Sequence, residues 1–119
     1  MKKGSTILIV EDEESHRLIL RKTLEDHGFN ITMAENGAVG LERMRTSKID
    51  LAIVDLEMPV MNGMEFTNWV KEYNPNFPVI ILTAHAENFS SKEIIAANVD
   101  GFIHKPIVID ELLRMIEKL

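Results

Sequence analysis

The chain has 119 residues, 45% of them hydrophobic, and a formal net charge of −6. This length suits one compact domain with its own core, so we expect a single domain over residues 1–119. The hydrophobic content excludes a disordered chain, and the absence of cysteine excludes disulfides and thiolate metal sites. The acidic balance argues against direct nucleic-acid binding.

We expect no signal peptide at the N-terminus. Lys2 and Lys3 precede an apolar run at 7–10, which is too short for the hydrophobic region of such a peptide. No stretch approaches the length needed to span a membrane. We therefore expect a cytoplasmic protein without membrane association.

Apolar runs and helical patterns alternate five times along the chain. The predicted strands lie at 6–10, 29–34, 51–54, 79–82 and 102–104. The predicted helices lie at 15–27, from Asn36-Gly37 onward, from Asn62 to before Pro75, at 90–97, and through the C-terminal stretch to 119. This alternation predicts an α/β fold, with one doubly wound parallel sheet and helices on both faces. Right-handed crossovers restrict the topology, and five strands favour the flavodoxin-like order 2-1-3-4-5.

Local signals support several of these helices. Asn62 is a predicted N-cap, and Ser90 with Glu93 has the spacing of a capping box. A set of large apolar residues falls at helical spacing in the third helix, and we predict that it packs in the core rather than binding a cofactor. The set consists of Phe66, Trp69, Val70 and Tyr73.

Polar residues with distinct chemistry follow four of the five predicted strands. Glu11 and Asp12 follow the first strand, and Asp55 ends the third. Thr83 follows the fourth strand and Lys105 the fifth. The carboxyl ends of parallel strands meet at one edge of the sheet, where open α/β folds bind ligands. We therefore expect these five residues to form one site, with its crevice between strands 1 and 3.

The residue types at this edge favour phosphoryl transfer. Three neighbouring carboxylates repel one another unless a cation lies among them, and hard oxygen ligands suit Mg²⁺. Thr83 offers a hydroxyl group and Lys105 a positive charge. Such a set can position a phosphoryl group and compensate its charge.

Four pieces of sequence together resemble the receiver domain of two-component response regulators. They are Glu11-Asp12, the stretch 55–63, Thr83-Ala84 and Lys105-Pro106. The resemblance covers essentially the whole chain. It implies a switch that accepts a phosphoryl group from a partner histidine kinase or a histidine phosphotransfer protein.

The resemblance also implies roles for the metal site. Asp55 would be the phosphoryl acceptor. Asp12 and Asp55 would bind Mg²⁺ directly, together with the main-chain carbonyl of Glu57. Glu11 stands where the family more often has Asp, and it would act through a water molecule.

Four further residues would handle the phosphoryl group and the response to it. Lys105 would contact the group, and Thr83 would shift to hydrogen-bond it. Phe102 lies at the position of the family's switch aromatic and could rotate into the space that Thr83 vacates. Ala84 is small and leaves room for the phosphate to enter.

The sequence alone leaves the role of several polar side chains open. The side chain of Glu57 either faces the site or is an exposed loop acid. We hypothesise that Glu57 and His85 set the lifetime of the phosphoryl group, because both flank the path of an attacking water. His16 and His27 are interpreted as exposed helix residues, and His104 as a solvated residue of an edge strand.

The leading hypothesis is a signalling switch that catalyses its own modification and turns over no external substrate. A phosphatase with an aspartyl nucleophile is one alternative, but the chain has no cap segment and Asp12 would be unexplained. A flavin carrier is disfavoured because the acids at 11–14 would repel a phosphate. A receiver that acts only as a binding module is the third alternative.

The sequence does not name the kinase, the pathway or the oligomeric state. It also leaves open whether an output domain follows residue 119. We expect a dimer or target contact on the face formed by the fourth helix, the fifth strand and the fifth helix.

Overall fold

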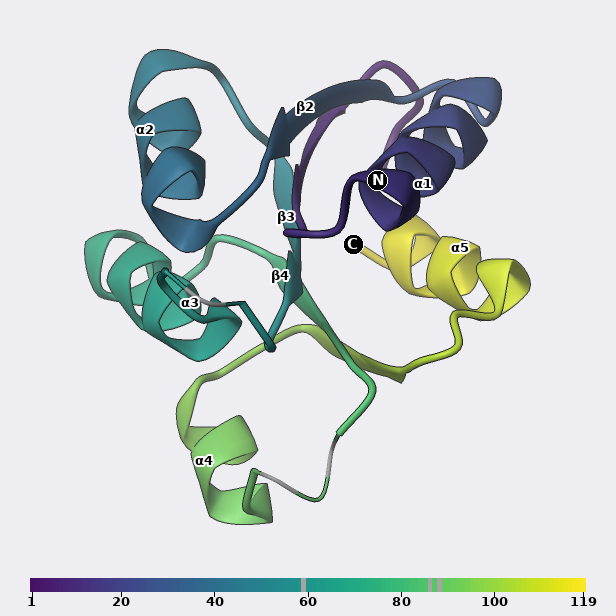
Figure 1. The fold of residues 1–119 in the computed structure, drawn as a ribbon. Helices are drawn as coiled ribbons and strands as arrows, with labels where there is room; N and C mark the ends of the chain where they lie inside the picture. The colour runs from purple at the N-terminus through teal and green to yellow at the C-terminus, as the bar shows by residue number, and fades with distance from the viewer. Residues whose placement is uncertain (59, 86, 88) are drawn as a thin grey trace.

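The computed structural model describes residues 1–58, 60–85, 87 and 89–119 (Figure 1). Pro59, which belongs to the stretch that carries the resemblance, lies outside the described residues. Strands and helices alternate as predicted along the described part of the chain. The elements are β1 (Thr6–Val10), α1 (Glu14–Asp26), β2 (Asn30–Ala34), α2 (Gly37–Thr46), β3 (Leu51–Asp55), α3 (Gly63–Tyr73), β4 (Val79–Thr83), α4 (Ser91–Ala96), β5 (Gly101–His104) and α5 (Ile109–Glu117).

The described strands form one parallel sheet in the order β2-β1-β3-β4-β5, which confirms the predicted topology. β1 and β3 are neighbours, with Val10 paired with Val54. The chain therefore leaves both strands at the same edge of the sheet, and Glu11 follows β1 next to Asp55. The two strands between which ligands bind in such folds are thus adjacent here.

The sheet is the middle of three layers. Figure 1 shows α1 and α5 on one face, and α2, α3 and α4 on the other. Alternate residues of each strand pack into the two cores: Ile53 lies in the α1–α5 core and Val54 in the opposite one. Because β1, β3 and β4 are covered on both faces, they carry nearly continuous apolar runs.

The predicted helix caps are present. Asn62 accepts a hydrogen bond from the Glu65 backbone N–H at 2.9 Å, and the Glu65 carboxylate accepts one from the Asn62 N–H at 3.4 Å. Ser90 and Glu93 form the same reciprocal pair at the start of α4. These caps satisfy backbone donors that a helix leaves unpaired at its first turn.

The prediction for the large apolar residues of α3 is half wrong. Phe66 and Val70 are buried, but Trp69 is 60% exposed and Tyr73 is 95% exposed. Trp69 and Tyr73 line a surface groove of about 770 Å³ between α2 and α3. Helical spacing places all four residues on one broad stripe, but this stripe is wider than the face that the sheet covers.

No helix in the described ranges is long and apolar enough to cross a bilayer.

Gly63 fixes how the chain after β3 returns to the sheet. Its backbone N–H donates to the Leu56 carbonyl at 3.1 Å, and a Cβ atom at this position would overlap the backbone carbonyl oxygen of Asp55. The overlap involves backbone atoms and cannot be relieved by a side-chain rotation. Only glycine allows α3 to begin this close to the end of β3.

We predict that Gly63→Ala lowers the free energy of unfolding by about 1–3 kcal/mol, the usual range for added volume in a packed site. Asn68→Ala, at an exposed position of the same helix, is the matched control and should change it little. Urea unfolding followed by circular dichroism measures both. Equal stability of the two variants would show that the chain around Asp55 is not closely packed.

Candidate functional site

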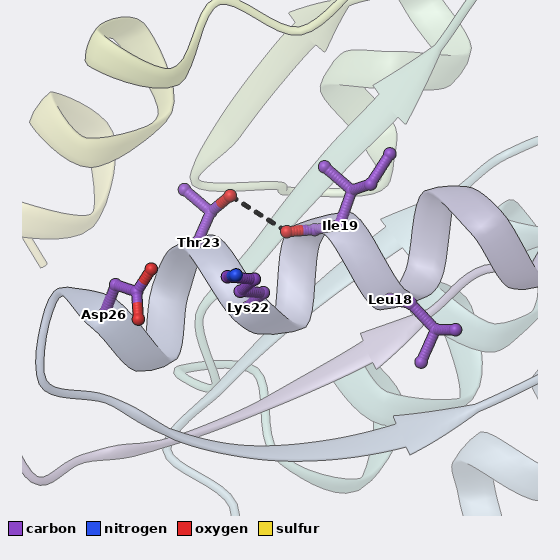
Figure 2. A pocket seen from close by; sticks show the side chains of 5 residues that line it. All are labelled: Leu18, Ile19, Lys22, Thr23 and Asp26. Carbon is purple, nitrogen blue, oxygen red and sulfur yellow. Dashed lines mark hydrogen bonds between the residues drawn. The ribbon is translucent and has the colours of Figure 1, made fainter.

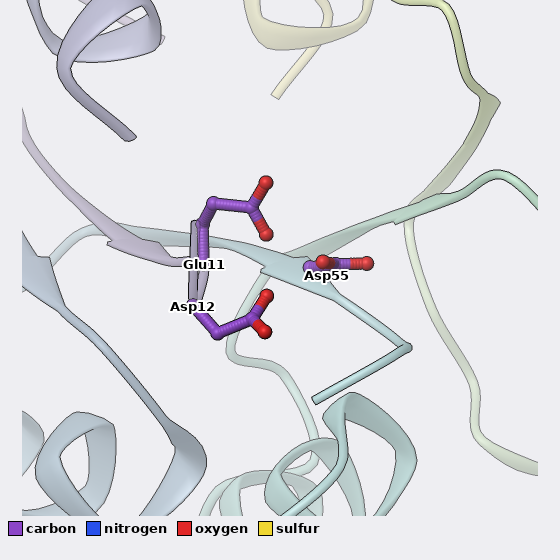
Figure 3. A group of neighbouring side chains, drawn as sticks. All are labelled: Glu11, Asp12 and Asp55. Carbon is purple, nitrogen blue, oxygen red and sulfur yellow. The ribbon is translucent and has the colours of Figure 1, made fainter. Parts of the chain in front are cut away.

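Three carboxyl groups meet at the carboxyl edge of the sheet. Glu11 and Asp12 follow β1, Asp55 ends β3, and one oxygen of each lies within 4.8 Å of the others. Figure 3 shows the three side chains extending into the same space from the ends of two strands. The sequence prediction that these residues come together is confirmed.

The three acids differ in their exposure to solvent. Glu11 is 1% exposed and Asp55 is 3% exposed, whereas Asp12 is exposed. Within the described part of the chain, Glu11 Oε2 is buried and has no hydrogen-bond partner. Burial of an ionised carboxylate costs several kcal/mol unless charges or hydrogen bonds compensate it. A neighbouring positive charge would offset this cost.

Lys105 supplies one positive charge to the buried pair. Its Nζ lies 3.3 Å from Glu11 Oε1 and 3.3 Å from Asp55 Oδ2. The Lys105 backbone N–H donates to the Thr83 carbonyl at 2.7 Å, which ties the chain after β5 to the end of β4. A single ammonium group thus bridges two carboxylates, and the prediction that Lys105 reaches the site is confirmed.

The charges at this site shift the pKa values of Asp55 and Lys105. The pKa of Asp55 is raised from 3.8 to about 6 by its burial and, secondly, by the adjacent Glu11 carboxyl. A hydrogen bond from Glu57 and the charge of Lys105 act in the opposite direction. Burial alone would lower the pKa of Lys105, but the Asp55 and Glu11 carboxylates outweigh it and raise that pKa.

Glu57 faces the site, which decides between the two readings of the sequence. Its Oε1 accepts hydrogen bonds from the Thr83 hydroxyl and, at 3.3 Å, from the His85 backbone N–H. The Glu57 backbone N–H donates to Asp55 Oδ1 at 3.2 Å. Thr83 is fully buried. The loop after β3 and the end of β4 are therefore linked through one carboxylate.

The two remaining predicted residues lie close to this edge in the chain. Phe102 is a half-buried residue of β5, paired with Ile81, and packs against the core on the α2–α4 side of the sheet. Ala84 directly follows Thr83 and is exposed. Their roles in switching and in admitting phosphate stay predictions.

Two residues of α1 that contact the site were missed in the sequence. His16 is exposed, as interpreted from the sequence, but its Nδ1 also lies 3.0 Å from Glu11 Oε1. Arg17 donates to the Glu11 carbonyl at 2.8 Å and to the Asp12 carbonyl at 3.3 Å. Side chains of a helix lean toward its N-terminus, so residues in the first turn of α1 point back toward the preceding loop. That rule gives the direction of these side chains but not the group that they meet.

The donor set fits a small divalent cation. All three acidic groups offer hard oxygen ligands, the type that Mg²⁺ prefers. The unpaired Glu11 Oε2 supplies an acceptor for a metal-bound water. That Asp12 and Asp55 hold the ion directly stays a prediction.

A surface hollow lies on α1, away from the three carboxylates. It is a shallow depression of about 350 Å³ (Figure 2), lined by Leu18, Ile19, Lys22, Thr23 and Asp26. The Thr23 hydroxyl donates a hydrogen bond to the Ile19 carbonyl at 2.9 Å. The three carboxylates of Figure 3 do not line it.

Residues 7–117 match the family model described as "Response regulator receiver domain". Among solved structures, the chain superposes on response regulator protein TrrA from Thermotoga maritima in complex with Mg²⁺-BeF, at 32% identity and a TM-score of 0.87. That alignment covers 96% of this chain and 97% of TrrA. The chemotaxis protein CheY4 from Vibrio cholerae aligns at 28% identity and a TM-score of 0.87, over 97% of this chain and 98% of CheY4.

Curated relatives are longer proteins. Transcriptional regulatory protein ZraR from Klebsiella oxytoca is 34% identical over 89% of this chain, but over only 24% of its own length. A cyclic di-GMP phosphodiesterase from Thermotoga maritima is 38% identical over 92% of this chain and 29% of its own length. The chain thus spans about a quarter of the length of such relatives.

We predict that Asp55→Asn stabilises the cation-free protein above pH 6. The pKa of Asp55 is higher in the folded state than in the unfolded state, so ionisation of this group opposes folding above about pH 6. The destabilisation by ionised Asp55 decreases as the pH drops from about 6 to 4, because Asp55 then becomes protonated in both the folded and the unfolded state. At about 1.4 kcal/mol per pKa unit, the gain for Asp55→Asn has an upper limit of about 3 kcal/mol.

Urea unfolding in EDTA at a series of pH values measures this difference. Asp26→Asn, which removes an exposed acid on α1, is the control and should show no comparable gain. The difference in unfolding free energy between Asp55→Asn and wild type should shrink as the pH falls. A difference that stays constant with pH, or grows as the pH falls, contradicts the raised pKa of Asp55.

Proposed function

Because this chain belongs to the response regulator receiver domain family, we propose that it is a phosphorylation-activated switch with Asp55 as its phosphoryl acceptor. The arrangement of Asp55 is the observation that supports this proposal most strongly. Asp55 is buried at the end of a central strand, and its Oδ2 lies 3.3 Å from the Lys105 ammonium group. Two further carboxylates stand beside it. This arrangement suits a nucleophile that receives a charged group.

In the proposed transfer, an Asp55 carboxylate oxygen attacks the phosphorus atom of a phosphohistidine on a partner kinase or phosphotransfer protein. A P–O bond forms, the P–N bond to the histidine breaks, and the imidazole nitrogen takes the electron pair. Lys105 moves with the charge and pairs with a phosphoryl oxygen. A small phosphodonor such as acetyl phosphate would react in the same way through its own P–O bond.

We propose that Asp12, Asp55 and the Glu57 carbonyl hold Mg²⁺ directly, and that Glu11 does so through water. When bound, the ion neutralises charge on the transferring phosphoryl oxygens. TrrA, which resembles this chain, was solved in complex with Mg²⁺-BeF, and this lends support to the proposal.

The proposed switch breaks the hydrogen bond between Thr83 and Glu57. A phosphoryl group on Asp55 offers new acceptor oxygens, toward which the Thr83 hydroxyl can turn. Phe102 then rotates toward the space that Thr83 leaves. The result is a change on the face formed by α4, β5 and α5, where we propose that an output partner or a second copy binds.

The family consists of signalling switches, and we propose no turnover of an external substrate. The relative that is named a phosphodiesterase aligns with this chain over only 29% of its own length. Its name is therefore no argument for turnover by this chain. The aspartyl phosphatase alternative gives no role to Asp12, which lies with Asp55 in one cluster. We further propose that the protein acts in the cytoplasm, where a kinase partner could reach it.

We predict that acetyl phosphate with Mg²⁺ adds one phosphoryl group to the wild-type protein, and that Asp55→Asn gains none. Intact-protein mass spectrometry measures the adduct. EDTA should abolish it, because the charge of the incoming group would then be left largely to Lys105. Asp26→Asn is the control for loss of an acidic residue and should gain the adduct like wild type.

Phosphatase activity is tested on the same samples. Sustained release of phosphate from small phosphomonoesters would favour the aspartyl phosphatase. A wild-type protein that gains no adduct would favour the receiver that only binds partners.

We also predict that Glu57 shortens the lifetime of the phosphoryl group. Its carboxylate lies beside Thr83 and can accept a hydrogen bond from an attacking water. Glu57→Ala should therefore slow the loss of phosphate, on the order of threefold to tenfold, a modest share of what a general base contributes. His85→Ala keeps the backbone N–H that donates to Glu57 and Thr83 but removes the imidazole ring. It should also change the decay, because we expect this ring to flank the path of the attacking water.

The decay is timed by mass spectrometry after the phosphodonor is removed. Glu35→Ala, at an exposed acid between β2 and α2, is the matched control and should decay like wild type. Unchanged decay in both the Glu57 and His85 variants would refute the hypothesis.

A further inference from the structure

We propose that His16 is a positioning residue of this site: it holds the Glu11 carboxylate in place for the cation. The inference rests on the proposed function and deepens it, because it assigns part of the Mg²⁺ affinity to a side chain of α1. His16 itself touches neither the phosphoryl group nor the ion.

The two oxygens of Glu11 have different surroundings. Oε1 lies 3.0 Å from His16 Nδ1 and 3.3 Å from Lys105 Nζ. Oε2 is buried and, among the described residues, has no partner. An ionised carboxylate oxygen can only accept, so the His16 Nδ1 carries the hydrogen and donates it. His16 thus fixes one oxygen and leaves the other available to a metal-bound water.

Glu11 needs such a restraint because its side chain is long and its other partner is shared. A glutamate side chain has three rotatable bonds and loses conformational entropy when it is fixed in one position. Lys105 pairs with Asp55 at the same distance as with Glu11. In the proposed phosphorylated state Lys105 turns to the phosphoryl group. His16 is then the partner that still holds Glu11.

The fold places His16 for this role. It is the third residue of α1, which begins at Glu14. Helical side chains lean toward the N-terminus, and the His16 ring therefore reaches back to the residue that follows β1. Arg17 anchors the backbone of the same loop through the Glu11 and Asp12 carbonyls. Side chain and backbone of Glu11 are thus both held from the first turn of α1.

A competing explanation is that His16 only stabilises the start of α1. Its Nδ1 also lies 3.3 Å from Glu13 Oε2, and its side chain is 49% exposed. Under that explanation the Glu13 contact would matter as much as the Glu11 contact. Variants of His16 and Glu13 separate the two.

Calorimetric titration of the unphosphorylated protein with Mg²⁺ tests the proposal. His16→Leu should weaken Mg²⁺ binding about tenfold, the lower end of the range for residues that orient a metal ligand. His16→Asn should restore most of the affinity, because its amide nitrogen can occupy the place of Nδ1. His16→Gln extends its amide further and should stay weak. Glu13→Gln should bind like wild type.

The rate of phosphorylation by acetyl phosphate gives a second readout. His16→Leu should be phosphorylated much more slowly than wild type at low Mg²⁺ and at the wild-type rate at saturating Mg²⁺, because only affinity for the ion is affected. Wild-type affinity in His16→Leu, or equal weakening in Glu13→Gln, overturns the proposal. If His16→Leu does not fold, equal affinities of His16→Asn and His16→Gln overturn it instead.

Wild-type protein distinguishes failure of this inference from failure of the proposed function. A wild type that neither binds Mg²⁺ nor accepts a phosphoryl group refutes the proposed function. A wild type that does both, beside a His16→Leu variant that behaves identically, refutes only the role of His16.

Discussion

The site depends on one charge balance: the Lys105 ammonium group lies between the buried carboxylates of Glu11 and Asp55. Burial of two carboxylates side by side is unfavourable, and a single ammonium group compensates only part of it. The raised pKa of Asp55 is the measurable sign of the remaining imbalance. In the proposed function, a divalent cation would compensate the rest of this negative charge and allow the site to accept a charged phosphoryl group.

The fold creates this balance by topology. β1 and β3 are adjacent and parallel, so their ends bring Glu11 and Asp12 next to Asp55 across more than 40 positions of sequence. The backbone link from Lys105 to Thr83 fixes the ends of β5 and β4 relative to each other. Glu57 connects Thr83 to the loop after β3. Hydrogen bonds thus connect the loop after Asp55, through Glu57 and Thr83, to the end of β5 at the edge of the sheet.

Much of this could be predicted from the sequence, since apolar runs that end in Asp55 or Thr83 mark both a strand and its functional end. What could not be predicted depends on side-chain direction and on the extent of neighbouring elements. His16 was missed because the spacing of residues in a helix does not show that its first turn faces a buried acid. Trp69 and Tyr73 were placed wrongly because helical periodicity gives a face, and only packing shows how much of that face is covered.

Chemical trapping of the modified residue tests the central claim most directly. Borohydride reduces an aspartyl phosphate to homoserine, and peptide mass spectrometry then locates the reduced residue in the chain. After treatment with acetyl phosphate and Mg²⁺, the account predicts homoserine at position 55 and at no other acidic position. Homoserine at position 12, or a stable phosphate on a serine, threonine or histidine, would contradict it.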